Sequence, residues 1–438
     1  AQHAGPQRGA DRAPTHASSR HRRPEPRNRE ALDGCADVAC RCRRRCRRDH
    51  GRGAPEAGGG LVRRRAVPHP CDVLAPCRRA PHDPLGRLAD ARESGRGIRT
   101  MSDRLRGELR LPGDKSMSHR ALLYAALADG ETLVVGAGDG HDVRSTAGIV
   151  AALGAAVSRE AAQPGDAPGT ARWRVRSGGR SSLRAAPAPL DCGNSGTSMR
   201  LGAGLVAGVP GVHTLIGDDS LQRRPMARVL EPLAAMGAAV GGSGESGTRA
   251  PLTIAGGALR GAHWAPATPS AQVKGCVLLA ALAASDASTY RETVATRDHS
   301  ERMLAARGAS LRATTDASGT TISIAPGELS ALPLVTIPGD PSSATFWLVA
   351  GSLHPDADLL VRGVSLNPTR RHAIDLLRRM GARIDEFPAA DDGSGEPVGD
   401  VRVRSAALHG IDMTPTDVAL AIDEVPILSL AAAMASGA

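Results

Sequence analysis

The chain has 438 residues, of which 41% are hydrophobic, so it is long and apolar enough for more than one folded domain. Its formal net charge of +10 is concentrated at the front. Residues 1–100 contain 23 arginines, no lysine and 11 acidic residues, a net charge of +12, which leaves −2 for residues 101–438. The later part is nearly neutral, which argues against a broad surface for nucleic acid or anionic membrane there.

The apolar runs and the cysteines indicate the cellular compartment of the protein. No uninterrupted apolar stretch approaches the roughly 18–20 residues that cross a bilayer, and no signal-peptide core follows the amino terminus. Only Cys192 and Cys276 lie beyond the first hundred residues, so no disulfide framework is expected. We therefore expect a cytoplasmic protein that does not bind membranes.

Residues 1–100 show neither helical nor strand periodicity. Such a segment has little apolar surface to offset the entropy lost on ordering, so we expect a basic extension that is disordered or non-native. Met101 stands eleven residues before Pro112, where the ordered pattern starts. We hypothesise that Met101 is the natural start and that residues 1–100 are translated upstream sequence.

Two alternatives for this front segment stay open. The arginine run is a candidate for nucleic-acid binding, although it lacks the interleaved aromatic side chains that stack on bases. Zinc binding is the other, although the spacing does not give paired cysteine knuckles; the candidate ligands are Cys35, Cys40, Cys42, Cys46 and His50.

After Met101 a pattern recurs about every 70–85 residues. Its most visible element is an amphipathic helix that ends near a glycine and precedes a short strand. Pro225 and Pro368 are expected in the first turns of two of these outer helices. The four copies are Ile149–Ala155, Leu230–Ala238, Met303–Ala309 and Ile374–Ala382.

The other element of the repeat is a more apolar helix that opens on small polar residues. Runs rich in Ala and Leu follow the first three openers, which predicts buried helices. The five openers are Asp114–Ser116, Asn194–Thr197, Ser270–Gln272, Asp340–Ser343 and Asp423–Glu424. Each unit therefore reads strand, buried helix, strand, outer helix, strand. Since a fifth unit begins at Asp423 and the sequence stops at Ala438, we expect a carboxyl-terminally truncated protein; the alternative is that the protein simply ends there.

Helix N-termini of this kind suit phosphate and carboxylate groups, because they present free backbone N–H groups and the positive end of the helix dipole. Any single opener is equally explained as an ordinary N-cap. Lysine usage sharpens the interpretation, since Lys115 and Lys274 stand against 53 arginines. Lys115 is expected to do something that arginine cannot, such as donating or sharing a proton as a compact ammonium. For Lys274, inside the third buried helix, a structural role is at least as good an explanation.

Three more charged positions fit an anion site. Arg120 lies five residues after Lys115, about one and a half helical turns, so it can reach a group at the same helix end. Arg223 and Arg224 precede an outer helix, where a guanidinium could grip a carboxylate or phosphate through two hydrogen bonds, although such a pair is usually a surface feature. Asp423 is a candidate proton acceptor or, again, an N-cap.

Together these motifs resemble the 3-phosphoshikimate 1-carboxyvinyltransferase (5-enolpyruvylshikimate-3-phosphate synthase) family from about residue 105 to the end. The first two matching stretches are the most specific, and the order of all seven agrees with the family. They are Leu111–Leu122, Asp191–Leu201, Gly217–Met226, Ser270–Lys274, Thr296–Leu304, Ile337–Phe346 and Ile422–Pro426.

The resemblance implies an α/β protein with the enolpyruvyl transferase fold, in which two domains are built from repeated βαβαββ units around buried helices. The first domain would comprise residues 101–116 and about 335–438, and the second about 117–334. It implies an enzyme that transfers the enolpyruvyl group of phosphoenolpyruvate to the 5-hydroxyl of 3-phosphoshikimate in chorismate and aromatic amino-acid biosynthesis. Clamping two polyanions would supply much of the catalysis.

Site residues follow from the resemblance one by one. Gly196 and Arg224 correspond to the phosphoenolpyruvate pocket, and Lys115 would touch both substrates. Asp423 falls where the family has the base that engages the 5-hydroxyl, so Lys115 and Asp423 are the candidate catalytic residues. The residues implied to bind 3-phosphoshikimate are Lys115, Ser116, Arg120, Ser270, Ala271 (through its backbone), Gln272, Arg297 and Asp423.

The same resemblance implies no metal and no organic cofactor, and we expect a monomer whose partners are small-molecule substrates and neither nucleic acid nor membrane. The family's Lys-Glu-Ser-Asp-Arg stretch, a later Asp-His-Arg segment and a final Lys have no counterpart in this chain. We therefore expect the chain as given to be inactive. The nearest rival enzyme is the UDP-N-acetylglucosamine enolpyruvyl transferase, which shares the repeat; a rival from another class is nucleic-acid binding through residues 1–100.

Overall fold

The structure is a computed structural model that describes residues 104–390, 393 and 395–437. The expectations for residues 1–100, including the disordered extension, the zinc site and the nucleic-acid site, lie outside the described residues. In the described part, no helix has both the length and the apolar character needed to cross a membrane.

The predicted repeat is present four times. The first unit, β1 Leu105–Arg110, α3 Lys115–Leu127, β2 Ala128–Gly138, α4 His141–Ala152, β3 Ala156–Glu160 and β4 Thr170–Gly178, has the order βαβαββ. The second consists of β5 Leu190–Asp191, α5 Gly196–Ala207, β6 Gly211–Ile216, α6 Asp219–Gln222, α7 Ala227–Ala235, β7 Ala239–Ser243 and β8 Arg249–Gly256. A short α6 is its only addition within these bounds.

The third unit is β9 His263–Trp264, α8 Ala271–Ala281, β10 Ser288–Glu292, α9 His299–Ala305, β11 Leu311–Asp316 and β12 Gly319–Ile324. The fourth is β13 Leu329–Ser330, β14 Leu334–Thr336, α10 Pro341–Leu353, β15 Ala357–Ser365, α11 His372–Arg379, β16 Arg383–Pro388 and β17 Val398–Arg404. Two helices follow, α12 Pro415–Leu420, which the sequence pattern did not predict, and α13 Val425–Met434.

The glycines that end the four outer helices are confirmed as helix stops. Gly154, Gly237, Gly308 and Gly381 have φ values of +109°, +95°, +83° and +94°, a region that side chains with a Cβ rarely adopt. The prediction for the two prolines is wrong: α7 begins at Ala227 and α11 at His372, so Pro225 and Pro368 lie ahead of the first turns.

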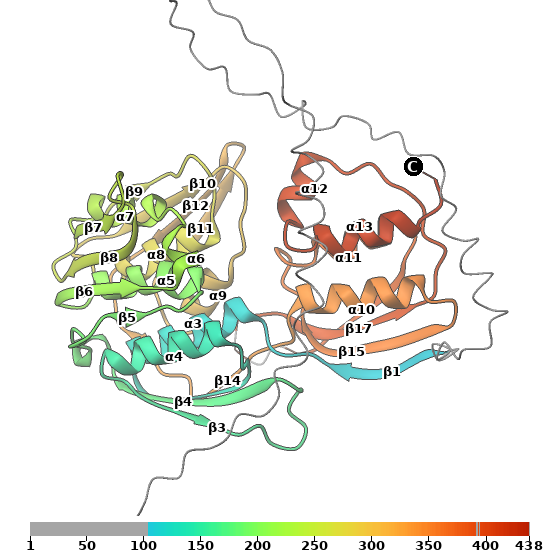
Figure 1. The fold of residues 1–438 in the computed structure, drawn as a ribbon, viewed down its shortest axis with the longest axis horizontal. Coiled ribbons are helices and arrows are strands. Elements are labelled where there is room, and N and C mark those ends of the chain that lie inside the picture. The colour runs from blue at the N-terminus through green and yellow to red at the C-terminus, as the bar shows by residue number, and fades with distance from the viewer. Residues whose placement is uncertain (1–103, 391–392, 394, 438) are drawn as a thin grey trace, which may run out of the picture. The chain divides into compact units, whose positions relative to one another are not determined.

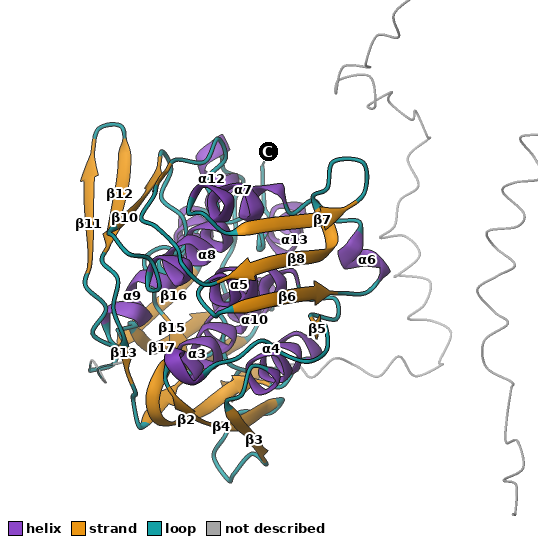
Figure 2. Cartoon of the chain, turned by 90° about the vertical axis from the view of Figure 1, so that its left-hand side faces the viewer, coloured by secondary structure: helices purple, strands orange, loops and turns teal. Residues whose placement is uncertain are grey.

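Four sheets carry the strands, in the orders β1-β15-β17-β16, β5-β6-β8-β7, β11-β12-β10-β9 and β13-β2-β4-β3, with β14 also paired to β2 (Figures 1 and 2). The first and fourth units exchange strands. β1 of the first unit pairs in parallel with β15 of the fourth, and β14 of the fourth pairs in parallel with β2 of the first. The residues that follow β1 and β14 are the two crossing segments, and a bridge between Gly113 and Gly339 joins them.

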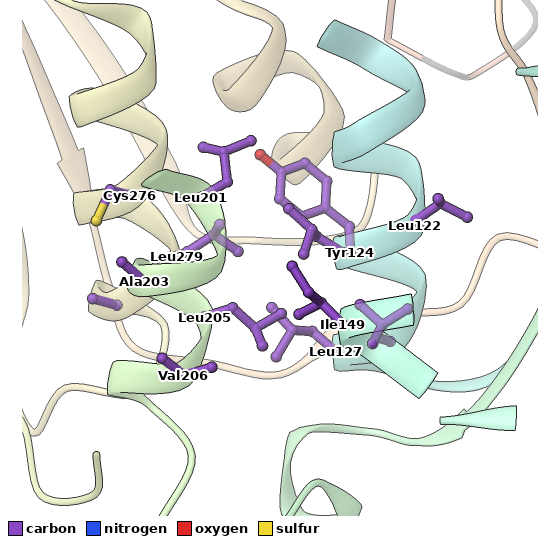
Figure 3. Close-up of a cluster of buried hydrophobic side chains, with 14 of the residues drawn as sticks. Leu122, Tyr124, Leu127, Ile149, Leu201, Ala203, Leu205, Val206, Cys276 and Leu279 are labelled. Carbon is purple, nitrogen blue, oxygen red and sulfur yellow. The ribbon is translucent and has the colours of Figure 1, made fainter. Parts of the chain in front are cut away.

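The buried apolar residues of the described part form two hydrophobic clusters. The larger runs from Met117 to Ile337 and is centred on α3, α5 and α8, whose side chains Tyr124, Leu201 and Leu279 face one another in Figure 3. The smaller combines Leu111 with residues from Ala344 to Ala431. The division into two domains at the stated boundaries stays a prediction, with which these clusters are compatible.

Burial of the five apolar helices is unequal. Eleven of the thirteen residues of α3 are buried, as the alternation-free run of Ala and Leu predicts. In α13, by contrast, only Leu428 and Ala431 are buried, and the Met434 side chain is 65% exposed. The prediction of a buried helix is therefore wrong for α13, because among the described elements it packs mainly on α10.

Candidate functional site

All five polar openers contain the N-cap position of their helix, and in three of them the cap side chain accepts a backbone hydrogen bond. Asp114 and Ser195 accept hydrogen bonds from the backbone of Met117 and Ser198, at 2.9 and 3.1 Å. Ser270, at the start of α8, makes no side-chain capping bond. The fifth N-cap position is Glu424, within the predicted opener Asp423–Glu424, and its side chain makes no capping bond either. The α8 N-terminus is therefore an anion-attracting end that its own cap residue does not occupy.

A cavity of about 420 Å³ collects seven of the ten candidate residues. Three helix starts contribute, those of α3, α8 and α13, together with the loop before α9. The seven are Ser116, Arg120, Ser270, Ala271, Gln272, Arg297 and Asp423. Residues more than 300 positions apart in the chain thus meet at one place, which sequence spacing alone could not establish.

Arg120 fixes the geometry of this cavity wall. It is 1% exposed, and its Nε donates to Ser300 Oγ at 2.8 Å. Its two terminal nitrogens donate to the carbonyls of Ser116, at 3.0 Å, and Ala271, at 3.5 Å. Because these acceptors are neutral, the guanidinium keeps its charge uncompensated and joins α3 to the α8 N-terminus.

Also lining the cavity, Arg297 forms an ion pair with Asp423, whose side chain is 52% exposed. Burial acts to raise the pKa of Asp423, but the hydrogen bond from Arg297 and the charges of Arg370 and Lys115 hold that pKa below its usual value. The carboxylate is therefore ionised at neutral pH and able to accept a proton from a nearby hydroxyl.

Arg370 is a site residue that the sequence reasoning missed. Its side chain is 3% exposed and lies near the caps of three helices: 3.5 Å from Asp114, 3.2 Å from Asp340 and 4.0 Å from Glu424. The nitrogen that lies near Glu424, Nη1, is also 3.9 Å from Asp423 Oδ2. No local motif announced it, because its partners are brought together only by the crossing segments.

Lys115, Gly196 and Arg224 do not line the cavity but lie beside it. Lys115 Nζ is 3.3 Å from Asp142 Oδ2, and the backbone carbonyl of Asp142 accepts from Ser198 in the first turn of α5. In the same turn, Thr197 Oγ1 accepts from Gln272 Nε2 at 3.2 Å. The α5 N-terminus thus adjoins both Lys115 and the cavity wall.

Two arginines stand over Gly196. A Cβ added there would lie 2.7 Å from Arg200 Nη1 and 3.3 Å from Arg224 Nη1. Arg224 donates to Asn194 Oδ1 at 2.9 Å. Burial and the charges of Arg228 and Arg224 lower the pKa of Arg200. Neither Arg200 nor Arg224 is ion-paired with a described carboxylate, so this corner suits a small anion; the sequence reasoning missed Arg200, although it lies in the second matching motif.

The arrangement favours binding of a polyanion and one proton transfer. Cationic side chains and a helix N-terminus surround the cavity, and one ionised carboxylate faces it. Among the described residues, no cluster of three or more His, Cys, Asp or Glu side chains could hold a metal ion.

Comparison with known proteins identifies the family. The EPSP synthase (3-phosphoshikimate 1-carboxyvinyltransferase) family model matches residues 99–438. The 3-phosphoshikimate 1-carboxyvinyltransferase of Chloroflexus aurantiacus is 45% identical over 341 residues, which cover 77% of this chain and 75% of the relative. That of Roseiflexus castenholzii is 48% identical over 338 residues, with 76% and 75% covered.

A solved structure agrees. The EPSP synthase from Acinetobacter baumannii superposes with a TM-score of 0.67 at 36% identity, over 76% of this chain and 72% of that one. The enolpyruvyl transferase fold expected from the sequence is thereby confirmed. This chain belongs to the EPSP synthase (3-phosphoshikimate 1-carboxyvinyltransferase) family.

Proposed function

We propose that this protein transfers the enolpyruvyl group of phosphoenolpyruvate to the 5-hydroxyl of 3-phosphoshikimate and releases phosphate, a step of aromatic amino-acid biosynthesis. The observation that carries the proposal is the convergence of seven predicted substrate-binding residues around one cavity. The UDP-sugar alternative is disfavoured, because the curated relatives bear the name 3-phosphoshikimate 1-carboxyvinyltransferase.

The 3-phosphate of the substrate is assigned to the end of the cavity formed by Arg297 and the α8 N-terminus. Ser270 and the backbone of Ala271 offer donors there, and Arg297 offers a guanidinium. Arg297 is paired with Asp423, so the phosphate competes with this carboxylate for it. Ser116, Arg120 and Gln272 would contact the rest of the molecule.

Asp423 is assigned as the proton acceptor. The oxygen of the 5-hydroxyl forms a bond to C2 of phosphoenolpyruvate while C3 gains a proton from the Lys115 ammonium, and Asp423 takes the hydroxyl proton. The bond from C2 to the phosphate oxygen then breaks, phosphate leaves with the proton that Asp423 took, and C3 returns a proton to Lys115 to restore the double bond. When the substrate phosphate draws Arg297 away, the carboxylate loses part of the interaction that lowers its pKa and becomes a better base.

Phosphoenolpyruvate is assigned to the corner beside Gly196. Arg224 would hold its charged groups, and Lys115, between this corner and the cavity, would contact both substrates. The Lys115 side chain is 60% exposed, so its ammonium is accessible to a ligand. Fixed positive charge around developing negative charge is the type of stabilisation that lowers the barrier for such a transfer.

Isothermal calorimetry on the 438-residue chain tests the proposal. We expect 3-phosphoshikimate to bind, shikimate to bind more weakly and UDP-N-acetylglucosamine not to bind. Substituting Arg297→Ala should weaken 3-phosphoshikimate about 10- to 100-fold, as expected for a lost charged hydrogen bond, and leave shikimate unaffected. Preferential binding of the UDP-sugar, or equal loss of both shikimate ligands, would refute the assignment.

A further inference from the structure

Lys274 occupies an enclosed position one turn inside α8. Its side chain is 0% exposed, and its Nζ lies 3.0 Å from Glu292 Oε1 and 2.6 Å from Glu301 Oε1. A third acceptor, the carbonyl oxygen of Thr296, lies at 3.5 Å. The three donors of an ammonium thus meet three acceptors, which a planar guanidinium with five donors could not reproduce in the same space.

Glu292 carries this interaction on to the loop before α9. Its Oε1 also accepts from the backbone N–H of Thr296 at 3.0 Å, and its Oε2 accepts from Thr296 Oγ1 at 2.7 Å. Thr296 therefore has its N–H, its hydroxyl and its carbonyl oxygen all bound by one buried ion pair. The next residue along the chain is Arg297, and both line the cavity.

Lys274 and the α8 N-terminus belong to the same helix. Ser270, Ala271 and Gln272 line the cavity within one turn of Lys274. The ammonium consequently joins the two structures that face the assigned phosphate position, the start of α8 and the loop that carries Arg297.

We propose that Lys274 is a positioning residue for substrate binding: through Glu292 and Thr296 it holds Arg297 at a fixed place relative to the α8 N-terminus. The proposal rests on the assignment of the phosphate to that end of the cavity. It explains why a chain with 53 arginines keeps a lysine here.

Glu301 supplies a matched control. It contacts the same ammonium as Glu292, but among the described residues the hydrogen bonds of Thr296 to a carboxylate go to Glu292, so Glu301 shares the burial and the charge without the connection to the loop. Burial raises the pKa of Glu301, with Lys274 opposing, and Glu301→Gln keeps the size of this side chain while removing its charge.

The first measurement needs no ligand. Hydrogen–deuterium exchange of the peptide containing Thr296 should be faster by about tenfold or more in Glu292→Gln and Lys274→Met, and unchanged in Glu301→Gln. Equal exchange in wild type and Lys274→Met would overturn the proposal, whether or not the protein binds 3-phosphoshikimate.

The second measurement tests the route through Arg297. In calorimetry, Lys274→Met and Glu292→Gln should weaken 3-phosphoshikimate about tenfold and shikimate less than twofold, while Glu301→Gln changes neither by more than about twofold. Combining Lys274→Met with Arg297→Ala should weaken 3-phosphoshikimate no further than Arg297→Ala alone. Additive losses would show that Lys274 does not act through Arg297.

A gentler variant covers the case in which Lys274→Met does not fold. Thr296→Val keeps the shape and the backbone N–H but removes the hydroxyl bound by Glu292, and it should lower the affinity for 3-phosphoshikimate by a few-fold. Lys274→Arg keeps the charge but not the shape of the ammonium, so its affinity should also be below that of wild type. The positioning role would be refuted if Thr296→Val and Lys274→Arg both bound 3-phosphoshikimate with wild-type affinity. Absence of any 3-phosphoshikimate binding by wild type would instead refute the proposed function, and the exchange experiment would still decide the role of Lys274.

Discussion

The two lysines of this chain occupy contrasting regions near the same site. Lys115 opens α3 with its side chain 60% exposed and has one carboxylate neighbour, Asp142, at 3.3 Å. Lys274 lies within α8 with a side chain that is 0% exposed and two carboxylate neighbours, Glu292 and Glu301. The difference separates a charge that a ligand can reach from a charge that organises the protein around the ligand.

The contrast also shows how a compact ammonium is used twice for different reasons. An exposed ion pair contributes little to stability, because water screens both partners and the side chains lose freedom when they pair. A buried ion pair depends on all its members, because removing one leaves the others charged and desolvated. The same residue type thus gives opposite expectations for folding and for binding.

The largest expected effect is on the buried side. Lys274→Met should lower the free energy of unfolding by about 3–5 kcal/mol, because Glu292 and Glu301 would remain buried without a counter-charge. Because a buried carboxyl without a counter-charge is destabilising only when it is ionised, the loss should grow as the pH rises above about 4.3, the ordinary pKa of glutamate. Urea unfolding at pH 5 and pH 8 measures this. A loss equal to that of Lys115→Met would break the comparison.

On the exposed side, Lys115→Met should reverse the pattern. Its unfolding free energy should stay within about 0.5 kcal/mol of wild type, since the Asp142 pair is largely solvated. Affinity for 3-phosphoshikimate should fall about 10- to 100-fold with the loss of a charged hydrogen bond to the ligand. Calorimetry and urea unfolding of the same preparation measure both, and unaltered affinity would contradict the assignment of Lys115.

A smaller effect is expected beside Gly196, where Arg200 and Arg224 form the corner assigned to phosphoenolpyruvate. Gly196→Ala would place a Cβ 2.7 Å from Arg200 Nη1, so Arg200 must shift while the fold is retained. We expect phosphoenolpyruvate to bind about tenfold more weakly to the complex with 3-phosphoshikimate, and 3-phosphoshikimate itself to bind normally. Titration of phosphoenolpyruvate into that complex tests this. An equal loss of affinity for both ligands would contradict the assignment of Gly196 to the phosphoenolpyruvate site.

The smallest expected effect concerns the half-exposed pair of Arg297 and Asp423. The lowered pKa of Asp423 means that its contribution to stability is complete above the ordinary pKa of about 3.9 and is lost as the pH falls through the lower folded value. Because the pair is half-exposed, this contribution should be under about 1 kcal/mol. Acid unfolding of Asp423→Asn should therefore show a slightly weaker pH dependence than wild type below about pH 4.

Sequence periodicity predicted the helices well where the signal was local. The four glycine stops, the polar helix openers and the apolar runs of α3, α5 and α8 each depend on residues within a few turns. It failed for the extent of burial of α13 and missed α12, because burial depends on which elements pack nearby. The motif resemblance selected the residues that meet at the cavity, although their roles stay proposals.

By itself, the sequence determined the repeated unit, the location of its helix ends and the scarcity of lysine, since all three are local or compositional. Only the tertiary structure decided what each lysine faces. The partners of Arg370 lie up to 256 positions away, and the acceptors of Lys274 come from β10, α9 and the loop between them. The partners of Arg370 meet where β1 pairs with β15 and β14 pairs with β2, and no sequence window of helical length contains those pairings.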